Sequence, residues 1–166
     1  VALISVDSFG ENSIIVAPGA SRSLSIEDIN KAEEKIKEAD IILMQLEIPI
    51  DTVEYAATIA CKYGKKVILN PAPASSLSNS FLMNVHTILP NRIEAEMLSG
   101  IKVMNIESAH RAAQAAGDVF CGAFSVCLSE GHSLAKSVKF ANAAAAIAVT
   151  RIGAQSAIPY KREVVL

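Results

Sequence analysis

The stretch Ala115-Ala116-Gly117-Asp118 places one carboxylate between small residues and an apolar segment. Residues 119–128 have the apolar spacing of a mostly buried helix, which we expect to end near Gly131. If that helix begins at Asp118, the small residues before it allow the free N–H groups of its first turn to approach a phosphate. Asp118 is then suited to take a proton from a substrate hydroxyl during phosphoryl transfer. The alternative is that Asp118 is simply the N-cap of the helix, and these four residues alone do not decide between the two.

Other polar side chains follow apolar runs earlier in the chain. Glu47 follows residues 43–46, Asn70 follows 67–69, and Asn91 with Glu94 follows 87–90. Each also has a purely structural explanation: a loop carboxylate, a turn residue before proline, and a helix capping box. Because the carboxyl ends of parallel strands share one edge of a sheet, we expect these side chains to lie along one crevice.

The elements that would position these residues alternate between strand and helix. Apolar runs predict strands within 13–20, 41–49, 65–73 and 86–91. Capping residues and glycines predict helices at 25–38, with a capping box from Ser25 to Asp28, at 51–63, capped by Asp51, at 92–98, and at 133–153, capped by Ser133. The alternation predicts a doubly wound α/β fold, with a mostly parallel sheet and helices on both faces.

Composition limits the classes of function. The chain has 166 residues, 51% hydrophobic and 19% charged, which fits a single packed domain. Its net charge of −2 gives no electrostatic reason to expect nucleic acid or an anionic membrane as a partner. No apolar run reaches the roughly 18 residues of a membrane helix, and no basic segment precedes the first apolar run, so we predict a cytoplasmic protein. The three cysteines and three histidines lack metal-ligand spacing, and we expect the cysteines to be reduced core thiols.

Four segments carry a resemblance to a known family: NPAPASSL (70–77), LPNRIEAEMLSGIKV (89–103), AAGDVFCGAF (115–124) and FANAAAAIAVTRIGAQSAIP (140–159). They resemble the PfkB carbohydrate kinase family, and within it the ribokinases more than the adenosine kinases or fructokinases. The resemblance implies a ribokinase-like α/β domain that phosphorylates the 5-hydroxyl of D-ribose with ATP. Two alternatives stay open: another PfkB-type sugar or nucleoside kinase, and a non-catalytic truncated remnant that keeps a phosphate pocket.

The resemblance also implies a role for each matching residue of the phosphoryl-transfer site. Asp118 matches the catalytic base that contacts the sugar hydroxyl. Asn91 matches a residue near the ATP phosphates, and Glu94 matches one that organises Mg²⁺ through water. The anion hole for the transferring group would be formed by Ala115, Ala116 and Gly117, of which Gly117 also contacts the nucleotide.

Further implied contacts lie outside that centre. Glu47 matches a carboxylate that contacts ribose, and Asn142 matches a position beside the nucleotide. Backbone carbonyl groups would surround an activating K⁺ ion at Ala148, Arg151, Gly153 and Ala157, the last standing where the family usually has serine. The implied small molecules are therefore D-ribose, ATP, Mg²⁺ and K⁺, and the implied assembly of the full-length protein is a homodimer.

The sequence departs from the family pattern in two places. We expect the lid and the N-terminal sugar-binding part to be absent. We also expect an internal gap between Gln114 and Ala115, because residues 107–114 resemble a helix that in the family lies well before the AAGD segment. A short helix running directly into a second one leaves no crossover strand between them. Three explanations stay open: separate parts of a longer protein numbered without gaps, a truncated gene product, and a designed fragment.

Overall fold

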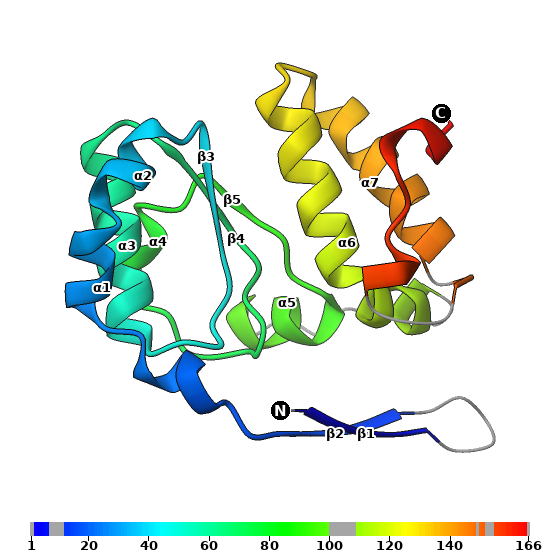
Figure 1. The fold of residues 1–166 in the computed structure, drawn as a ribbon, viewed down its shortest axis with the longest axis horizontal. Helices are drawn as coiled ribbons and strands as arrows, with labels where there is room; N and C mark the ends of the chain where they lie inside the picture. Colours follow the sequence, from blue (N-terminus) through cyan, green and yellow to red (C-terminus); the bar gives the residue numbers. More distant parts are fainter. Residues whose placement is uncertain (1, 7–11, 100–108, 149, 152–154, 166) are drawn as a thin grey trace.

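The structure is a computed structural model, and it describes residues 2–6, 12–99, 109–148, 150–151 and 155–165. Three parallel strands form its main sheet: β3 (Ile41–Met44), β4 (Lys66–Leu69) and β5 (Thr87–Ile88). β4 lies in the middle, with Ile42 opposite Val67 on one side and Ile68 opposite Thr87 on the other. Each of these strands lies within a predicted apolar run, and the chain between consecutive strands contains a helix, as parallel pairing requires (Figure 1).

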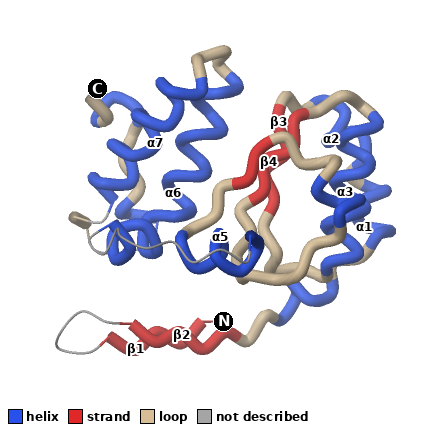
Figure 2. Tube along the Cα trace, turned by 180° about the vertical axis from the view of Figure 1, so that it is seen from behind, coloured by secondary structure: helices blue, strands red, loops and turns tan. Residues whose placement is uncertain are grey.

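The central strand is buried on both faces of the sheet. Val67 and Leu69 pack into one hydrophobic core together with α3 (Ile50–Lys62). Ile68 points the other way, into a second core with Phe124 of α6 (Ala109–Ser129) and Ala141 of α7 (Leu134–Ala148). Figures 1 and 2 show the two groups of helices on opposite sides of the sheet. The predicted doubly wound α/β architecture is confirmed.

The helices on the first face are α1 (Ile26–Lys31), α2 (Glu33–Glu38), α3 and the short α4 (Asn79–Leu82). The predicted helix over 25–38 is thus divided in two at Ala32, while the capping box is confirmed, since Ser25 and Asp28 exchange hydrogen bonds of 3.3 and 3.0 Å. The prediction that Asp51 caps the next helix is wrong. α3 begins after Pro49, so Asp51 lies inside its first turn, where a negative charge favours the helix dipole.

On the second face, α6 and α7 pack closely against each other and cover Ile68. Small buried side chains on α7 allow this approach: Ser137, Ala141, Ala144 and Ala148. The rings of Phe120 and Phe124 stack with their centroids 6.1 Å apart. The Ser133 hydroxyl accepts a hydrogen bond of 3.3 Å from the Lys136 N–H, which confirms Ser133 as the cap of α7.

Residues 2–6 and 12–16 pair with each other and do not join the main sheet. β1 (Ala2–Val6) and β2 (Asn12–Val16) pair antiparallel in their own two-stranded sheet, with Leu3 and Ile15 exposed. The prediction that the run within 13–20 joins the parallel sheet is therefore wrong. A short connection cannot carry a parallel crossover, so two neighbouring apolar runs pair antiparallel.

In the described part of the chain, the remaining elements are α5 (Arg92–Ser99) and three short 3₁₀ helices, η1 (Gly19–Ser23), η2 (Gln155–Ala157) and η3 (Lys161–Glu163). Arg151 donates to Glu163 at 2.7 Å, and Lys161 forms a short ion pair with Glu130 at the end of α6. These contacts hold the C-terminal segment against α6 and α7. Within the described residues, no helix is long and apolar enough to span a membrane.

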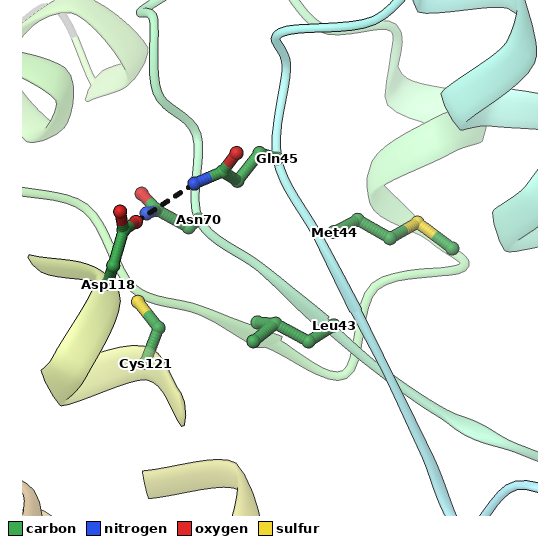
Figure 3. Close-up of a pocket in the computed structure, with 6 residues that line it drawn as sticks. All are labelled: Leu43, Met44, Gln45, Asn70, Asp118 and Cys121. Carbon is green, nitrogen blue, oxygen red and sulfur yellow. Dashed lines mark hydrogen bonds between the residues drawn. The ribbon is translucent and has the colours of Figure 1, made fainter. Parts of the chain in front are cut away.

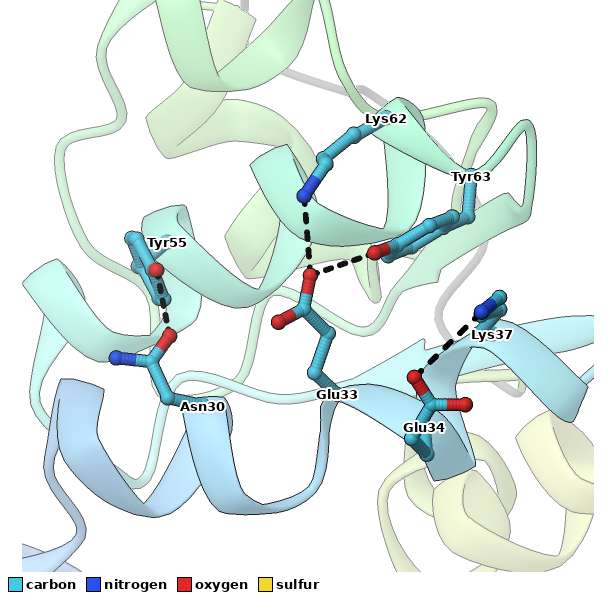
Figure 4. Close-up of polar contacts among 7 residues, drawn as sticks. All are labelled: Asn30, Glu33, Glu34, Lys37, Tyr55, Lys62 and Tyr63. Carbon is cyan, nitrogen blue, oxygen red and sulfur yellow. Dashed lines mark hydrogen bonds and ion pairs between the residues drawn. The ribbon is translucent and has the colours of Figure 1, made fainter.

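A polar network joins α1 and α2 to α3 (Figure 4). The Tyr63 hydroxyl donates to the Glu33 carboxylate at 2.7 Å, and Lys62 donates to the same oxygen at 3.0 Å. Tyr55 donates to Asn30 at 2.6 Å. The hydrogen bond from Tyr63, aided by Lys62, holds the pKa of Glu33 below its usual range.

This lowered pKa predicts how stability depends on pH. A carboxylate with a depressed pKa in the folded state stabilises the fold above its unfolded pKa, and that contribution is lost as the pH falls through the folded pKa. We expect Glu33→Gln to lower the Tm at pH 7 and to narrow the difference in Tm between pH 7 and pH 3. The control is Glu34→Gln, which removes an exposed ion pair with Lys37 of 3.5 Å and should change the Tm less. Equal thermal shifts in both variants would contradict the role of Glu33.

Candidate functional site

An open pocket of about 290 Å³ lies where α6 meets the carboxyl ends of β3 and β4. Its polar lining consists of Gln45, Asn70 and Asp118, and its remaining lining residues are Leu43, Met44 and Cys121 (Figure 3). Gln45 and Asn70 each follow the last residue of their strand. The pocket therefore lies at the edge of the sheet that the alternation of strands and helices predicts for a ligand site.

The alternation of side chains along the strands explains why these residues meet. Ile42, Met44 and Leu46 pack into the core on the α3 side, so Leu43 and Gln45 face α6. Asn70 follows Ile68 by two residues and shares its face. On α6, Asp118, Cys121 and Phe124 are spaced three residues apart and lie on the side of the helix that faces the sheet. The packing of Phe124 on Ile68 thereby brings Asp118 to the strand ends.

Asp118 is exposed, and its Oδ1 accepts a hydrogen bond of 3.0 Å from Nε2 of Gln45. The contact joins residues 73 positions apart in the sequence. Asp118 and Asn70 were predicted from the sequence, but Gln45 was not, and Glu47 was the predicted functional residue after this strand. The available signal was a polar residue in the otherwise apolar run 41–46, at a strand position that faces the second layer of helices.

The prediction of reduced core thiols is confirmed for Cys121 and Cys127, which are free and buried, and it is wrong for Cys61, which is exposed. Cys121 was not predicted to line the pocket. Cys121 is buried and lines the pocket, one helical turn from Asp118. Burial raises the pKa of the Cys121 thiol to about 11, and the carboxylates of Asp118 and Glu94 add to the effect. The thiol is therefore protonated and unreactive at neutral pH, and it lies within electrostatic reach of both carboxylates.

The predicted helix start at Asp118 is wrong. α6 begins at Ala109 and runs without a break through Ala115, Ala116, Gly117 and Asp118. Only the first four N–H groups of a helix lack acceptors inside it. The N–H groups of residues 115–118 lie beyond the first turn of α6, so they donate to carbonyl groups within the helix. Neither the N-cap role of Asp118 nor an anion hole at 115–117 is formed in this structure. The alanine-rich sequence before Gly117 favours helix, and one glycine costs too little to end it.

Asn91 and Glu94 form the reciprocal capping box at the start of α5. The Asn91 N–H and Nδ2 donate to the Glu94 carboxylate at 2.8 and 2.6 Å, and the Glu94 N–H donates to the Asn91 side-chain oxygen at 2.9 Å. Glu94 is buried. Among the described residues, no group of three or more His, Cys, Asp or Glu could hold a metal ion. A Mg²⁺ ion held mainly by nucleotide phosphates and water would be compatible with a single nearby carboxylate, and the contact of Glu94 with Mg²⁺ stays a prediction.

The other predicted contact residues lie apart from this pocket lining. Glu47 is exposed in the loop after β3, and Asn142 is exposed on α7. Of the four residues predicted around K⁺, Gly153 lies outside the described residues. Ala157 is buried in η2, and the Ala148 carbonyl at the end of α7 accepts a hydrogen bond of 3.1 Å from the Arg151 N–H. The K⁺ site at these four residues therefore stays a prediction.

The continuity of α6 can be tested with its two glycines. A Cβ added at Gly117 or Gly122 would meet no atom within 4 Å. Glycine in a helix interior destabilises it relative to alanine, so we expect Gly117→Ala and Gly122→Ala each to raise the free energy of unfolding by about 0.5–1 kcal/mol. Urea unfolding measures the free energy of unfolding of both variants. A gain from Gly122→Ala alone would place the start of the helix after Gly117.

The environment of Cys121 predicts slow chemical labelling. In a Cys61→Ser/Cys127→Ser double variant, Cys121 is the single thiol. With a pKa of about 11, we expect it to react at pH 8 on the order of 100-fold more slowly than an ordinary exposed cysteine. The rate should rise about tenfold per pH unit up to about pH 10. Rapid labelling in the folded protein at pH 8, with unchanged circular dichroism, would contradict the buried position beside two carboxylates.

Comparisons with known proteins place this arrangement in a family. The model of the pfkB family carbohydrate kinase matches residues 1–115 and 113–161. A ribokinase from Haemophilus influenzae is 38% identical over an alignment of 204 residues, which covers 98% of this chain and 67% of the relative. Since this chain has 166 residues, the alignment includes residues of the relative that have no counterpart here.

Solved structures agree with this assignment. The crystal structure of a ribokinase from Thermotoga maritima is 33% identical, with a TM-score of 0.80 over 98% of this chain and 67% of that one. The structure of Arabidopsis thaliana ribokinase complexed with ribose and ATP is 26% identical, with a TM-score of 0.84 over the same shares of the two chains. The chain spans about two thirds of the length of these relatives and has the ribokinase fold. It belongs to the pfkB family of carbohydrate kinases.

Proposed function

We propose that this protein is a ribokinase-type phosphotransferase that transfers the γ-phosphoryl group of ATP to the 5-hydroxyl of D-ribose, with Asp118 as general base. The observation that carries the proposal is the exposed Asp118 carboxylate in a pocket at the carboxyl ends of β3 and β4. It occurs in a pfkB-family chain, and the relatives aligned along nearly its whole length are ribokinases. Both the position of the site and the kinship support the same reaction.

In the proposed reaction, the ribose 5-hydroxyl oxygen forms a bond to the γ-phosphorus as the bond from that phosphorus to the bridging oxygen of ADP breaks. Asp118 Oδ2 accepts the hydroxyl proton, since Oδ1 is engaged by Gln45. Positioning and charge stabilisation dominate such transfers, so a well-placed base and a confined phosphate matter more than a strong nucleophile. Glu47 and Asn142 are the proposed contacts to ribose and nucleotide.

The inorganic ions stay part of the proposal. Mg²⁺ would neutralise charge on the ATP phosphates, and Asn91 and Glu94 are the residues proposed to lie beside it. K⁺ would be held by the carbonyl groups predicted at residues 148–157. The homodimer of the full-length protein and its cytoplasmic location likewise remain predictions.

We further propose that a segment is missing between Gln114 and Ala115. The family model matches in two parts that meet at residues 113–115, and the AAGD segment continues the preceding helix. This continuity favours a second candidate function: a non-catalytic remnant in which the amides of 115–117 are unavailable to a phosphoryl group. The two candidates differ in whether the chain turns over ATP in the presence of ribose.

A coupled assay of ADP release with ribose and ATP decides between them. If Asp118 is the base, we expect Asp118→Asn to lower kcat by about 10²–10⁴-fold, because the amide cannot accept the proton yet preserves the shape. Glu34→Gln, an exposed change on α2, is the control and should leave kcat unchanged.

Three outcomes would revise the proposal. Equal activity in wild type and Asp118→Asn would remove Asp118 as the base. Faster turnover with fructose, adenosine or another sugar would replace ribose as the substrate within the same family. No sugar-dependent ADP release from a chain with an intact mass of 17.5 kDa would favour the non-catalytic remnant.

A further inference from the structure

One polar contact in the pocket joins the two layers that create it. Gln45 extends from the end of β3, and its Nε2 donates to Oδ1 of Asp118 on α6 at 3.0 Å (Figure 3). The Gln45 oxygen and nitrogen are assigned by this contact, since a carboxylate accepts and does not donate. Neither the family match nor the predicted set of site residues includes a role for Gln45.

We infer that Gln45 is a positioning residue for Asp118, holding one carboxylate oxygen so that the other faces the substrate hydroxyl. The inference rests on the proposed function, because positioning matters for catalysis only if Asp118 is the base. It differs from that proposal in naming the group that fixes the orientation of the base.

The need for such a group follows from the exposure of Asp118. An exposed carboxylate is not fixed by packing, and its last torsion angle rotates over a broad range. A hydrogen bond to a charged acceptor is stronger than one between neutral groups, and it restricts that rotation. Since catalysis is sensitive to misplacement of about 1 Å, fixing the carboxylate plane has a direct effect on rate.

The backbone around Gln45 makes it a rigid anchor. On one side of it, the Met44 carbonyl accepts from the Asn70 N–H at 2.9 Å, and on the other side the Leu46 N–H donates to the Ala72 carbonyl at 2.9 Å. Met44 and Leu46 are also buried in the core on the α3 face. The amide of Gln45 thus extends from a fixed point of the sheet toward the helix that carries the base.

Two substitutions separate positioning from packing. Gln45→Met keeps the length and removes the donor, and we expect kcat to fall on the order of 10-fold, with the KM values for ribose and ATP and the Tm nearly unchanged. Gln45→Glu keeps the shape but places a second carboxylate against Asp118. The two carboxylates then share a proton, so the acid limb of the kcat profile should move to higher pH.

The matched control is Asn84→Met. It removes another half-buried side-chain amide, which donates to Thr58 at 3.4 Å and does not line the pocket. We expect kcat and its pH profile to stay as in the wild type. A purely structural role of Gln45 would lower the Tm or raise KM without moving the pH profile, and this result would overturn the inference.

A readout independent of turnover separates failure of this inference from failure of the proposed function. In ¹⁵N-labelled protein, the side-chain NH₂ signal of Gln45 should shift with pH as Asp118 titrates, and the shift should disappear in Asp118→Ala. A signal that is flat with pH in the wild type overturns the contact. If the signal follows Asp118 but kcat is unchanged in Gln45→Met, the contact stands and its catalytic role is overturned. If the wild type shows no ribose-dependent turnover, the proposed function fails, while this titration still decides whether Gln45 holds Asp118.

Discussion

The contact between Phe124 and Ile68 is the constraint on which the site depends. Phe124 is fully buried between the sheet and α7, and Ile68 is the central-strand residue that faces it. With this contact made, the residues of α6 that lie one and two turns earlier must pass the carboxyl ends of the strands. Asp118 therefore reaches the pocket because a phenylalanine six residues later is seated in the core. The candidate catalytic group is an exposed carboxylate, but hydrophobic packing determines its position.

Much of the fold could be predicted from sequence, because local patterns and tertiary packing agree in this chain. The runs at 41–44 and 67–69 are apolar on both faces, as strands covered by helices on two sides require. The capping boxes at Ser25 and Asn91 were predictable for the same reason, since each is completed within four residues. The wrong predictions arose where a partner decides the structure. The strand over 12–16 pairs with residues 2–6 and not with the main sheet. An apolar run indicates a strand but does not indicate which other strand it pairs with.

The site was predicted less completely than the fold, and Gln45 shows why. Its contact with Asp118 joins distant segments, and it depends on which face of β3 the residue occupies and on how far along the sheet α6 lies. Strand alternation gives the face, but the position of α6 depends on packing that a single sequence does not specify. Conversely, Asp118 was predicted as a site residue, but the predicted start of its helix was wrong. A small-residue segment followed by a carboxylate is compatible with both the start and the interior of a helix.

The Asn91–Glu94 capping box sets a condition on any nucleotide chemistry at this site. All three of its hydrogen bonds use the side-chain groups that the proposed ATP and Mg²⁺ contacts would need. A carboxylate oxygen has more than one lone pair, and the Asn91 amide has a second N–H, so the box and an outer-sphere contact through water are compatible. Direct coordination by Glu94 would have to compete with the Asn91 amide and expose the first turn of α5. If Mg²⁺ binds here, Glu94 could contact it through water while the capping box keeps its hydrogen bonds and α5 stays intact.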